Sequence, residues 1–259
     1  MSIQVLVATM NQTDHSLLEK MNIQSDAIIA NQYDKNEIEN FKYNGYDIKY
    51  LSLSERGVGL NRNTALMRAT SDICIIADDD LRYVDDYPSI VEKCFIENPD
   101  IDVIIFELNK KSKKRFSINK KQKITYLNFM KYGCARIAFK RKAITKNGIS
   151  FNLHFGGGAE YGSGEDSLFL HECLKKKLRI IALPITIATL EEERPSTWFE
   201  GYTDKYFFDR GALFACISKR LAKILCLQFC IRHYKLFDKS WIEAYKIMVC
   251  GIKDFKNRL

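Results

Sequence analysis

The chain has 259 residues, which is long enough for one large α/β domain or two small ones with a sizeable core. Its eight cysteines contain no C-x-x-C pair and indicate reduced core residues rather than a disulfide framework or a zinc site. The N-terminus begins directly with a strand pattern, and no stretch of about twenty apolar residues occurs. We therefore expect neither a signal peptide nor a membrane span, and a cytoplasmic location.

The net charge of +8 is concentrated in two parts of the chain. Residues 211–259 hold ten Lys and Arg against three Asp and Glu, while residues 1–210 are nearly neutral. Residues 108–159 contain no Asp or Glu, and their Lys and Arg are densest at 110–115. Basic surfaces of this kind attract phosphorylated substrates, anionic lipid or nucleic acid.

The first hundred residues predict alternating strands and helices. Short apolar runs indicate strands, and segments with helical spacing indicate helices. This alternation is typical of βαβ units and predicts a doubly wound, mostly parallel sheet. The expected strands are residues 3–8, 26–30, 48–53, 73–77 and 101–106, and the expected helices are residues 16–21, 62–69 and 87–97.

The second half of the chain has a different pattern. Residues 126–139 have strand character, and residues 178–187 predict a further strand. Between them, a glycine-rich segment at 156–164 predicts a mobile loop that leads into a helix beginning near Glu165. Residues 210–233 predict an amphipathic helix, for which two interpretations remain open. It lies on an anionic membrane as basic interfacial helices do, or it packs on the body with its lysines in water.

Three consecutive carboxylates, Asp78, Asp79 and Asp80, follow the expected strand at 73–77. Ligands of open α/β sheets bind beyond the carboxyl ends of the strands, so this run lies where a ligand is expected. Adjacent carboxylates repel one another unless a cation neutralises them, and their oxygens suit Mg²⁺ or Mn²⁺. A solvated acidic loop is the alternative interpretation.

A second acidic pair, Glu165 and Asp166, follows Gly164 at the start of a predicted helix. Carboxylates at this position complement the positive end of the helix dipole, so a simple N-terminal cap is one interpretation. The other interpretation is a general base beside a bound substrate.

The order of these motifs resembles the family-two glycosyltransferases, which have the GT-A fold and bind nucleotide-sugars. The resemblance spans about residues 3–211. Any one motif is weak, but several in the family's order make a more specific signal. The matching segments are residues 7–9 (Val-Ala-Thr), residues 56–63 (Arg-Gly-Val-Gly-Leu-Asn-Arg-Asn), the aspartates at 78–80 and the Glu-Asp pair at 165–166.

The resemblance implies nucleotide and metal contacts at the end of the first and fourth strands. Ala8 and Thr9 would contact the base of the nucleotide. Asp78, with Asp79 beside it, would contact the ribose or base. Asp80 would hold a divalent metal, Mn²⁺ or Mg²⁺, that bridges the two phosphates of the donor.

The resemblance also implies roles for basic and acidic residues around the reaction. Arg56 and Arg62 would contact the nucleotide or its pyrophosphate, because a guanidinium forks well onto phosphate. Asp166 would accept the proton of the acceptor hydroxyl, with Glu165 beside it in the acceptor site. The reaction would be a single displacement with inversion, as in hexosyltransferases of this family.

The chain departs from the family's pattern at two points. The acidic motif common after the second strand is replaced by residues 29–32 (Ile-Ala-Asn-Gln), where Asn31 is expected to hydrogen-bond the base without adding charge. The histidine common after the last strands is absent from residues 189–193 (Thr-Leu-Glu-Glu-Glu), so a third metal ligand is unassigned. Trp198 is expected to stack on a sugar, and a buried core position is the alternative.

Together these patterns predict an α/β fold of GT-A type in three parts. Residues 1–107 form the nucleotide-sugar-binding half, 108–210 the acceptor-binding half, and 211–259 a basic helical extension. The expected donor is a nucleotide-diphosphate sugar, with a UDP-sugar favoured. The expected acceptor is a glycan or a polyprenyl-diphosphate-linked oligosaccharide of surface polysaccharide biosynthesis.

The extension suggests a location at the inner face of the plasma membrane. Two alternative functions remain open: a nucleotidyltransferase with a related sheet, and a non-catalytic basic module that binds membrane or nucleic acid. A nucleic-acid partner is not expected, because the aspartates would repel its phosphates.

Overall fold

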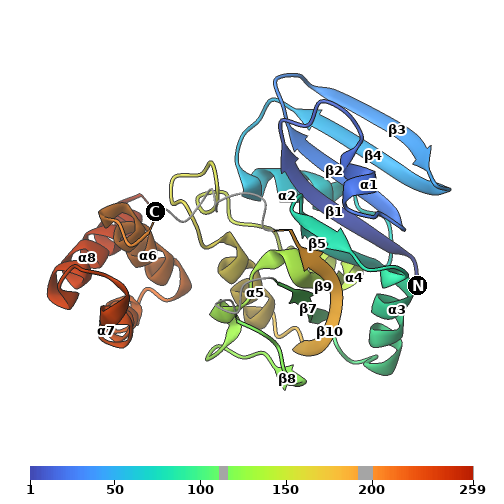
Figure 1. Ribbon diagram of the computed structural model, residues 1–259. Coiled ribbons are helices and arrows are strands. Elements are labelled where there is room, and N and C mark those ends of the chain that lie inside the picture. Colours follow the sequence, from blue (N-terminus) through green and yellow to red (C-terminus); the bar gives the residue numbers. More distant parts are fainter. Residues whose placement is uncertain (111–115, 192–200, 259) are drawn as a thin grey trace.

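The computed structural model describes residues 1–110, 116–191 and 201–258. Figure 1 shows a sheet with flanking helices, which we call the sheet body, and a group of C-terminal helices beside it. The strands are β1 (Ile3–Met10), β2 (Asp26–Gln32), β3 (Glu37–Tyr43), β4 (Tyr46–Leu53), β5 (Ile73–Asp78), β6 (Leu81–Tyr83), β7 (Val103–Asn109), β8 (Gln122–Lys123), β9 (Ile137–Lys140) and β10 (Ile180–Leu190). The α-helices are α1 (Leu17–Lys20), α2 (Val58–Arg68), α3 (Tyr87–Glu97), α4 (Arg141–Lys146), α5 (Glu165–Lys175), α6 (Asp204–Ile217), α7 (Ala222–His233) and α8 (Trp241–Asn257).

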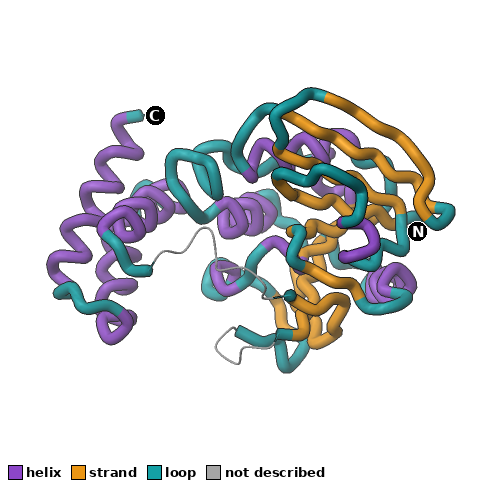
Figure 2. The backbone as a smooth tube through the Cα atoms, turned by 45° about the horizontal axis from the view of Figure 1, so that its top comes forward, coloured by secondary structure: helices purple, strands orange, loops and turns teal. Residues whose placement is uncertain are grey.

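The strands form one sheet in the order β3-β4-β2-β1-β5-β9-β7-β10-β6, with β8 paired to β10. The neighbours β4, β2, β1 and β5 run parallel, and so do β7 and β10. Antiparallel pairs involve β3, β6, β8 and β9. The predicted α/β class is confirmed, with a sheet that is mixed where a mostly parallel one was expected. Figure 2 shows this sheet with helices on both of its faces.

The sheet is buried on both faces because its central strands are apolar throughout. Val5 and Val7 of β1 belong to the core under α1 and α3, while the intervening Leu6 belongs to the core under α2. The same alternation in β5 places Ile75 in the first core and Ile76 in the second. Continuous apolar runs of this kind are typical of strands covered by helices on both sides.

Two segments of the sheet body differ from the prediction. The hairpin of β3 with β4 was not predicted, although its turn at Asn44 and Gly45, both with positive φ, is a typical hairpin signal. Of the strand expected at 126–139, only β9 at its end forms. Asn128 captures nearby backbone groups instead, since its side chain accepts from Thr125 N at 2.8 Å and donates to the Lys123 carbonyl at 3.1 Å.

The C-terminal helices α6, α7 and α8, which we call the helical module, share one core with the loop before α5. Gly211 in α6 and Gly251 in α8 lie where the two helices cross, and a Cβ on either would overlap the backbone of the other helix. The expected boundary between residues 210 and 211 falls inside α6. None of the helices in the described ranges is long and apolar enough to span a membrane.

The helix expected at 210–233 is two helices. The break lies at Ser218, which has extended backbone and accepts a hydrogen bond from Leu221 N through its hydroxyl at 3.2 Å. This bond favours the start of a new helix, because the serine oxygen accepts from a backbone amide that has no partner within the first turn.

Candidate functional site

The three aspartates at the end of β5 enter three different environments. Asp78 lies beside Ala8 of β1 and accepts from Arg62 Nη2 at 2.7 Å. Asp79 accepts from the Thr9 hydroxyl at 2.6 Å. Asp80 is exposed, and its carbonyl accepts from Glu191 N at 2.8 Å. The carboxyl end of β1 and β5 is therefore the acidic edge that the sequence predicted.

Arg62 joins this edge to the second acidic pair. From α2, its Nη1 contacts Glu165 Oε1 at 3.1 Å and Asp166 Oδ1 at 2.9 Å, while Nη2 holds Asp78. The guanidinium is buried and lies over the Phe151 ring at 5.4 Å. The two acidic segments thus meet at one buried cation. Arg62 was predicted to contact the nucleotide, and in the structure its terminal nitrogens bind carboxylates from both acidic segments.

The cluster shifts the pKa values of Glu165 and Arg62. Burial, and then the charge of Asp166, raise the pKa of Glu165 to about 7, although Arg62 opposes the shift. Burial also lowers the pKa of Arg62, but Asp78 and the other acids outweigh this and raise it overall. Asp166 is the more accessible of the pair, with 29% of its side chain exposed against 12% for Glu165.

Asp166 has two further neighbours that the sequence analysis did not identify. Cys134 is buried near Asp166, and burial and then the charge of this carboxylate raise the pKa of the Cys134 thiol. A Cβ on Gly133 would lie 3.3 Å from Asp166 Oδ2, so the backbone at Gly133 passes close to the carboxylate. No local sequence signal marks these two residues, because they reach the site through β9 and its neighbouring turn.

A mobile glycine-rich loop was expected before α5, but hydrogen bonds hold residues 154–164 in place. Gly156 N donates to the Tyr161 carbonyl at 2.8 Å, and Val58 N donates to the Gly157 carbonyl at 2.9 Å. Tyr161 also donates through its hydroxyl to Asp254 of α8 at 2.8 Å. The glycines serve close packing here: Gly156 has φ 109°, and a Cβ on it would overlap the side chain of Val58.

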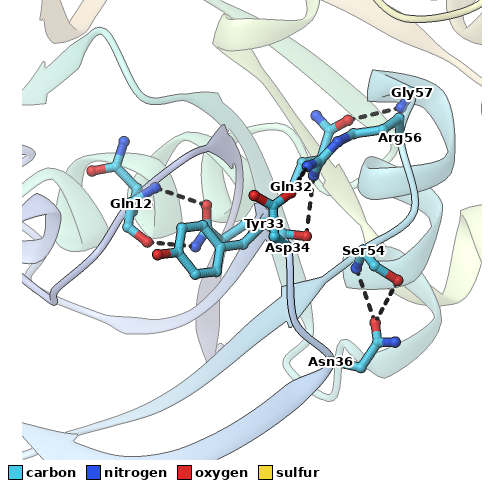
Figure 3. A network of polar contacts seen from close by, with 9 residues as sticks. Gln12, Gln32, Tyr33, Asp34, Asn36, Ser54, Arg56 and Gly57 are labelled. Atoms are coloured by element: carbon cyan, nitrogen blue, oxygen red, sulfur yellow. Dashed lines mark hydrogen bonds and ion pairs between the residues drawn. The ribbon is translucent and has the colours of Figure 1, made fainter.

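A polar network lies beside the acidic edge, where β1 and β2 end (Figure 3). Asn31 is buried and makes two hydrogen bonds to the backbone of Gln12. Its side-chain oxygen accepts from Gln12 N at 3.1 Å, and its side-chain nitrogen donates to the Gln12 carbonyl at 2.9 Å. Gln12 also donates through Nε2 to the Thr9 hydroxyl at 3.0 Å. Asn31 was expected to meet the base, but these bonds assign its side chain to fixing the loop after β1.

The other half of this network holds the start of α2. Gln32 accepts from Gly57 N at 2.7 Å, and Gly57 caps the helix at φ 119°, a conformation that favours glycine. Arg56 pairs with Asp34 at 2.5 Å and donates to the Tyr33 carbonyl at 3.2 Å. Arg56 is partly exposed, and these two bonds hold its guanidinium beside the start of α2.

Two further predictions concern a metal ion at Asp80 and a sugar-stacking role for Trp198. Within the described ranges, no three His, Cys, Asp or Glu side chains gather into a metal cage. An exposed carboxylate at the sheet edge nevertheless fits a divalent ion that takes one or two carboxylates and completes its shell with substrate phosphates, so Asp80 suits that role. Trp198 lies outside the described residues.

Comparisons with known proteins agree with this geometry. The family model described as Glycosyl transferase family 2 matches residues 15–158. A search of curated protein sequences finds no match. The match to the family favours a glycosyltransferase over a nucleotidyltransferase or a non-catalytic module.

Among solved structures, the fold is similar to TarS of S. aureus. One TarS structure has a TM-score of 0.62 and 15% identity, covering 92% of this chain and 44% of TarS. TarS 1-349 in complex with UDP-GlcNAc has a TM-score of 0.57 and 16% identity, covering 100% of this chain and 72% of that one. Its complex with UDP gives 0.56 and 17%, covering 100% and 71%.

This chain thus spans less than half of the longer TarS structure, and at these identities the likeness shows the fold alone. The fold agrees with the expected GT-A type. Together with the match over residues 15–158, it shows that the chain belongs to glycosyl transferase family 2.

Proposed function

We propose that this glycosyltransferase transfers a sugar from a nucleotide-diphosphate sugar, with a UDP-sugar favoured, to a glycan or lipid-linked acceptor with inversion. The observation that carries the proposal is the meeting of Asp78, Glu165 and Asp166 at Arg62, next to Asp79 and Asp80. The TarS complexes with UDP-GlcNAc and UDP support this donor class, because they have the same fold.

Asp166 is the proposed general base. Its Oδ1 is fixed by Arg62 at 2.9 Å while the side chain remains partly exposed, so the carboxylate is both oriented and accessible. The acceptor oxygen would form a bond to the anomeric carbon as the bond to the diphosphate oxygen breaks. The hydroxyl proton would go to Asp166, and the electron pair would leave with the nucleoside diphosphate.

Glu165 would serve a different role from its neighbour. A pKa of about 7 leaves much of this carboxyl protonated at neutral pH, so it can donate a hydrogen bond to an acceptor. Because Glu165 is also the more buried acid, it is poorly placed to attack the sugar. One accessible base without a second carboxylate nucleophile favours single displacement, and hence inversion.

The fold family implies a divalent ion, Mn²⁺ or Mg²⁺, which Asp80 would hold. When bound, such an ion would neutralise charge that builds on the leaving diphosphate. Thr9 and Asp79 are hydrogen bonded to each other at the same edge, so they would form the polar floor beneath the donor.

The acceptor proposal rests on charge. Residues 108–159 contain no acid and many Lys and Arg, and they lie in the sequence between the two acidic segments of the site. A basic wall suits an acceptor that carries phosphate, such as a polyprenyl-diphosphate-linked oligosaccharide of surface polysaccharide assembly. Such an acceptor would bring the enzyme to the inner face of the plasma membrane. Equal turnover with a lipid-linked acceptor and with its free sugar, insensitive to salt, would contradict this part.

Calorimetric titration of UDP and of GDP, with and without Mn²⁺, tests the donor site. We expect metal-dependent binding of UDP that is lost in Asp80→Asn and kept in Asp47→Asn, an exposed carboxyl at the other end of the sheet. In parallel, Asp166→Asn should keep UDP binding while turnover falls by about a hundredfold or more. Binding of neither diphosphate under any condition would overturn the proposal.

A further inference from the structure

Helix α7 presents several large apolar side chains to solvent. The residues that it buries fully are small, namely Ala222, Cys226 and Cys230, and Leu225 and Phe229 pack partly buried beside them. Ile224 and Ile231 point outward with 62% and 56% of their surface exposed. A helix that only packs on the body would show the reverse arrangement, with aliphatic residues inward.

These outward residues form one continuous face. At about 100° per residue, Ile224, Leu227 and Ile231 fall within a sector of about 60°. Further exposed apolar residues lie just before and just after α7 and at the start of α8: Leu221, Tyr234, Leu236, Trp241 and Ile242. Figure 1 shows α7 at the bottom of the helical module, where it packs on α6 and α8.

The charges on α7 and its flanking segments, residues 219–237, all have one sign, whereas the exposed Asp238 and Glu243 lie beyond this stretch near the start of α8. No Asp or Glu occurs in residues 210–237. Lys223 and Arg232 are exposed and lie about 180° apart, one on each side of the apolar sector. The exposed side chains Lys219, Arg220 and Lys235 extend the same basic border at the two ends of α7.

We propose that this face, which we call the α7 face (residues 219–242), lies in the interface of an anionic lipid bilayer. A narrow apolar sector between two rows of cations, with Tyr and Trp at its edge, has the composition of helices that lie in the plane of a membrane. The cations complement anionic headgroups, whereas a second copy of the chain would bring the same positive border against itself. The occupant that this pattern fits best is therefore a lipid surface.

This inference deepens the proposed function and rests on it in one respect: the proposed lipid-linked acceptor is the reason why the enzyme would bind a membrane. The surface itself does not depend on the chemistry, because none of the acidic-site residues belongs to it. Binding to vesicles without substrate therefore separates the two proposals: the α7 face can fail while UDP still binds, and UDP binding can fail while vesicles still bind.

The test is sedimentation of the full chain with large vesicles of phosphatidylglycerol and phosphatidylcholine, compared with phosphatidylcholine alone. The test variant is Ile224→Ser/Ile231→Ser. Its matched control is Ile38→Ser/Ile96→Ser, which changes two equally exposed isoleucines on the sheet body. We expect binding only to the anionic vesicles, weakened by high salt, and reduced by about tenfold or more in the test variant but not in the control.

Unchanged vesicle binding by the test variant, or binding of the parent to neither vesicle, would overturn the proposal. A sedimentation-velocity run without lipid covers the main competing occupant. Self-association that the test variant abolishes, in a parent that does not bind vesicles, would assign the face to a second copy instead.

Discussion

The acidic cluster at Arg62 and the α7 face both contain side chains in unfavourable surroundings: carboxylates that are partly buried and aliphatic side chains that are exposed to water. In the cluster, three carboxylates are drawn toward the interior, and Arg62 compensates them from within the chain. On the α7 face, aliphatic side chains project into water, and no described residue covers them. The first arrangement has a partner of opposite charge inside the protein, whereas the second becomes favourable only when an outside partner is present.

The largest effect is expected when the cation of the acidic cluster, Arg62, is removed. Arg62→Leu should lower the free energy of unfolding by about 3–5 kcal/mol, because it leaves buried carboxylates without their cation. Urea unfolding monitored by circular dichroism measures the loss. Arg56→Leu is the control, since its pair with Asp34 is exposed and is expected to contribute less than about 1 kcal/mol. Equal losses in the two variants would show that Arg62 does not compensate the cluster.

The second test uses pH. The pKa of Glu165 is about 7 in the folded chain against 4.5 as its ordinary value, so between them the folded chain keeps a proton that the unfolded chain has lost. The stability contributed by this proton is therefore present at low pH and is lost as pH rises toward 7. Relative to Glu165→Gln, the parent should lose about 3 kcal/mol between about pH 4.5 and pH 8.

Urea unfolding of both proteins at several pH values measures this difference. Glu172→Gln, a partly exposed acid on the same helix, controls for the general effect of removing a carboxyl from α5. A difference between parent and Glu165→Gln that stays flat with pH would contradict the raised pKa.

A smaller effect is expected at the edge of the cluster. Thr9→Val removes the hydroxyl that donates to Asp79 at 2.6 Å and accepts from Gln12. The loss should be about 1 kcal/mol of unfolding free energy, typical of one or two net hydrogen bonds. Thr9→Ser keeps the hydroxyl and should stay close to the parent in thermal unfolding. A similar loss in Thr9→Ser would assign the effect to packing of the Thr9 methyl group.

The smallest effect is expected on the α7 face itself. Without lipid, Ile224→Ser/Ile231→Ser should change the free energy of unfolding by less than about 1 kcal/mol, because both side chains are mainly in water already. Thermal unfolding of parent and variant checks this. A large loss would mean that these side chains stabilise the module, and the contrast with Arg62 would disappear.

Much of the fold could be predicted because the central strands carry their signal locally. The apolar run before Asp78 identified both β5 and the acidic edge, since a buried strand and the polar residues after it are adjacent in sequence. The hairpin at Asn44 and Gly45 had an equally local signal but was not recognised. By contrast, the turns around Asn128 depend on side-chain bonds to nearby backbone, which compete with the strand that the composition favoured.

The sequence predicted the two acidic segments of the site, but it did not predict the contacts that join them. The residue types at 78–80 and 165–166 indicated carboxylate chemistry, and the structure brings both segments to one place. The role of Arg62 depends on where α2 packs relative to α5, which no short pattern encodes. The same reason applies to Cys134 and Gly133, whose proximity to Asp166 is set by the fold around β9.

The hydrogen bond between Tyr161 and Asp254 has a consequence for how such chains diverge. Tyr161 is buried in the core shared with the module, so losing Asp254 alone would leave its hydroxyl without that partner. Recombination that exchanged the C-terminal helices would therefore also require a new residue at 161. In related sequences we expect positions 161 and 254 to covary, which ties the inheritance of the helical module to that of the loop before the acidic pair.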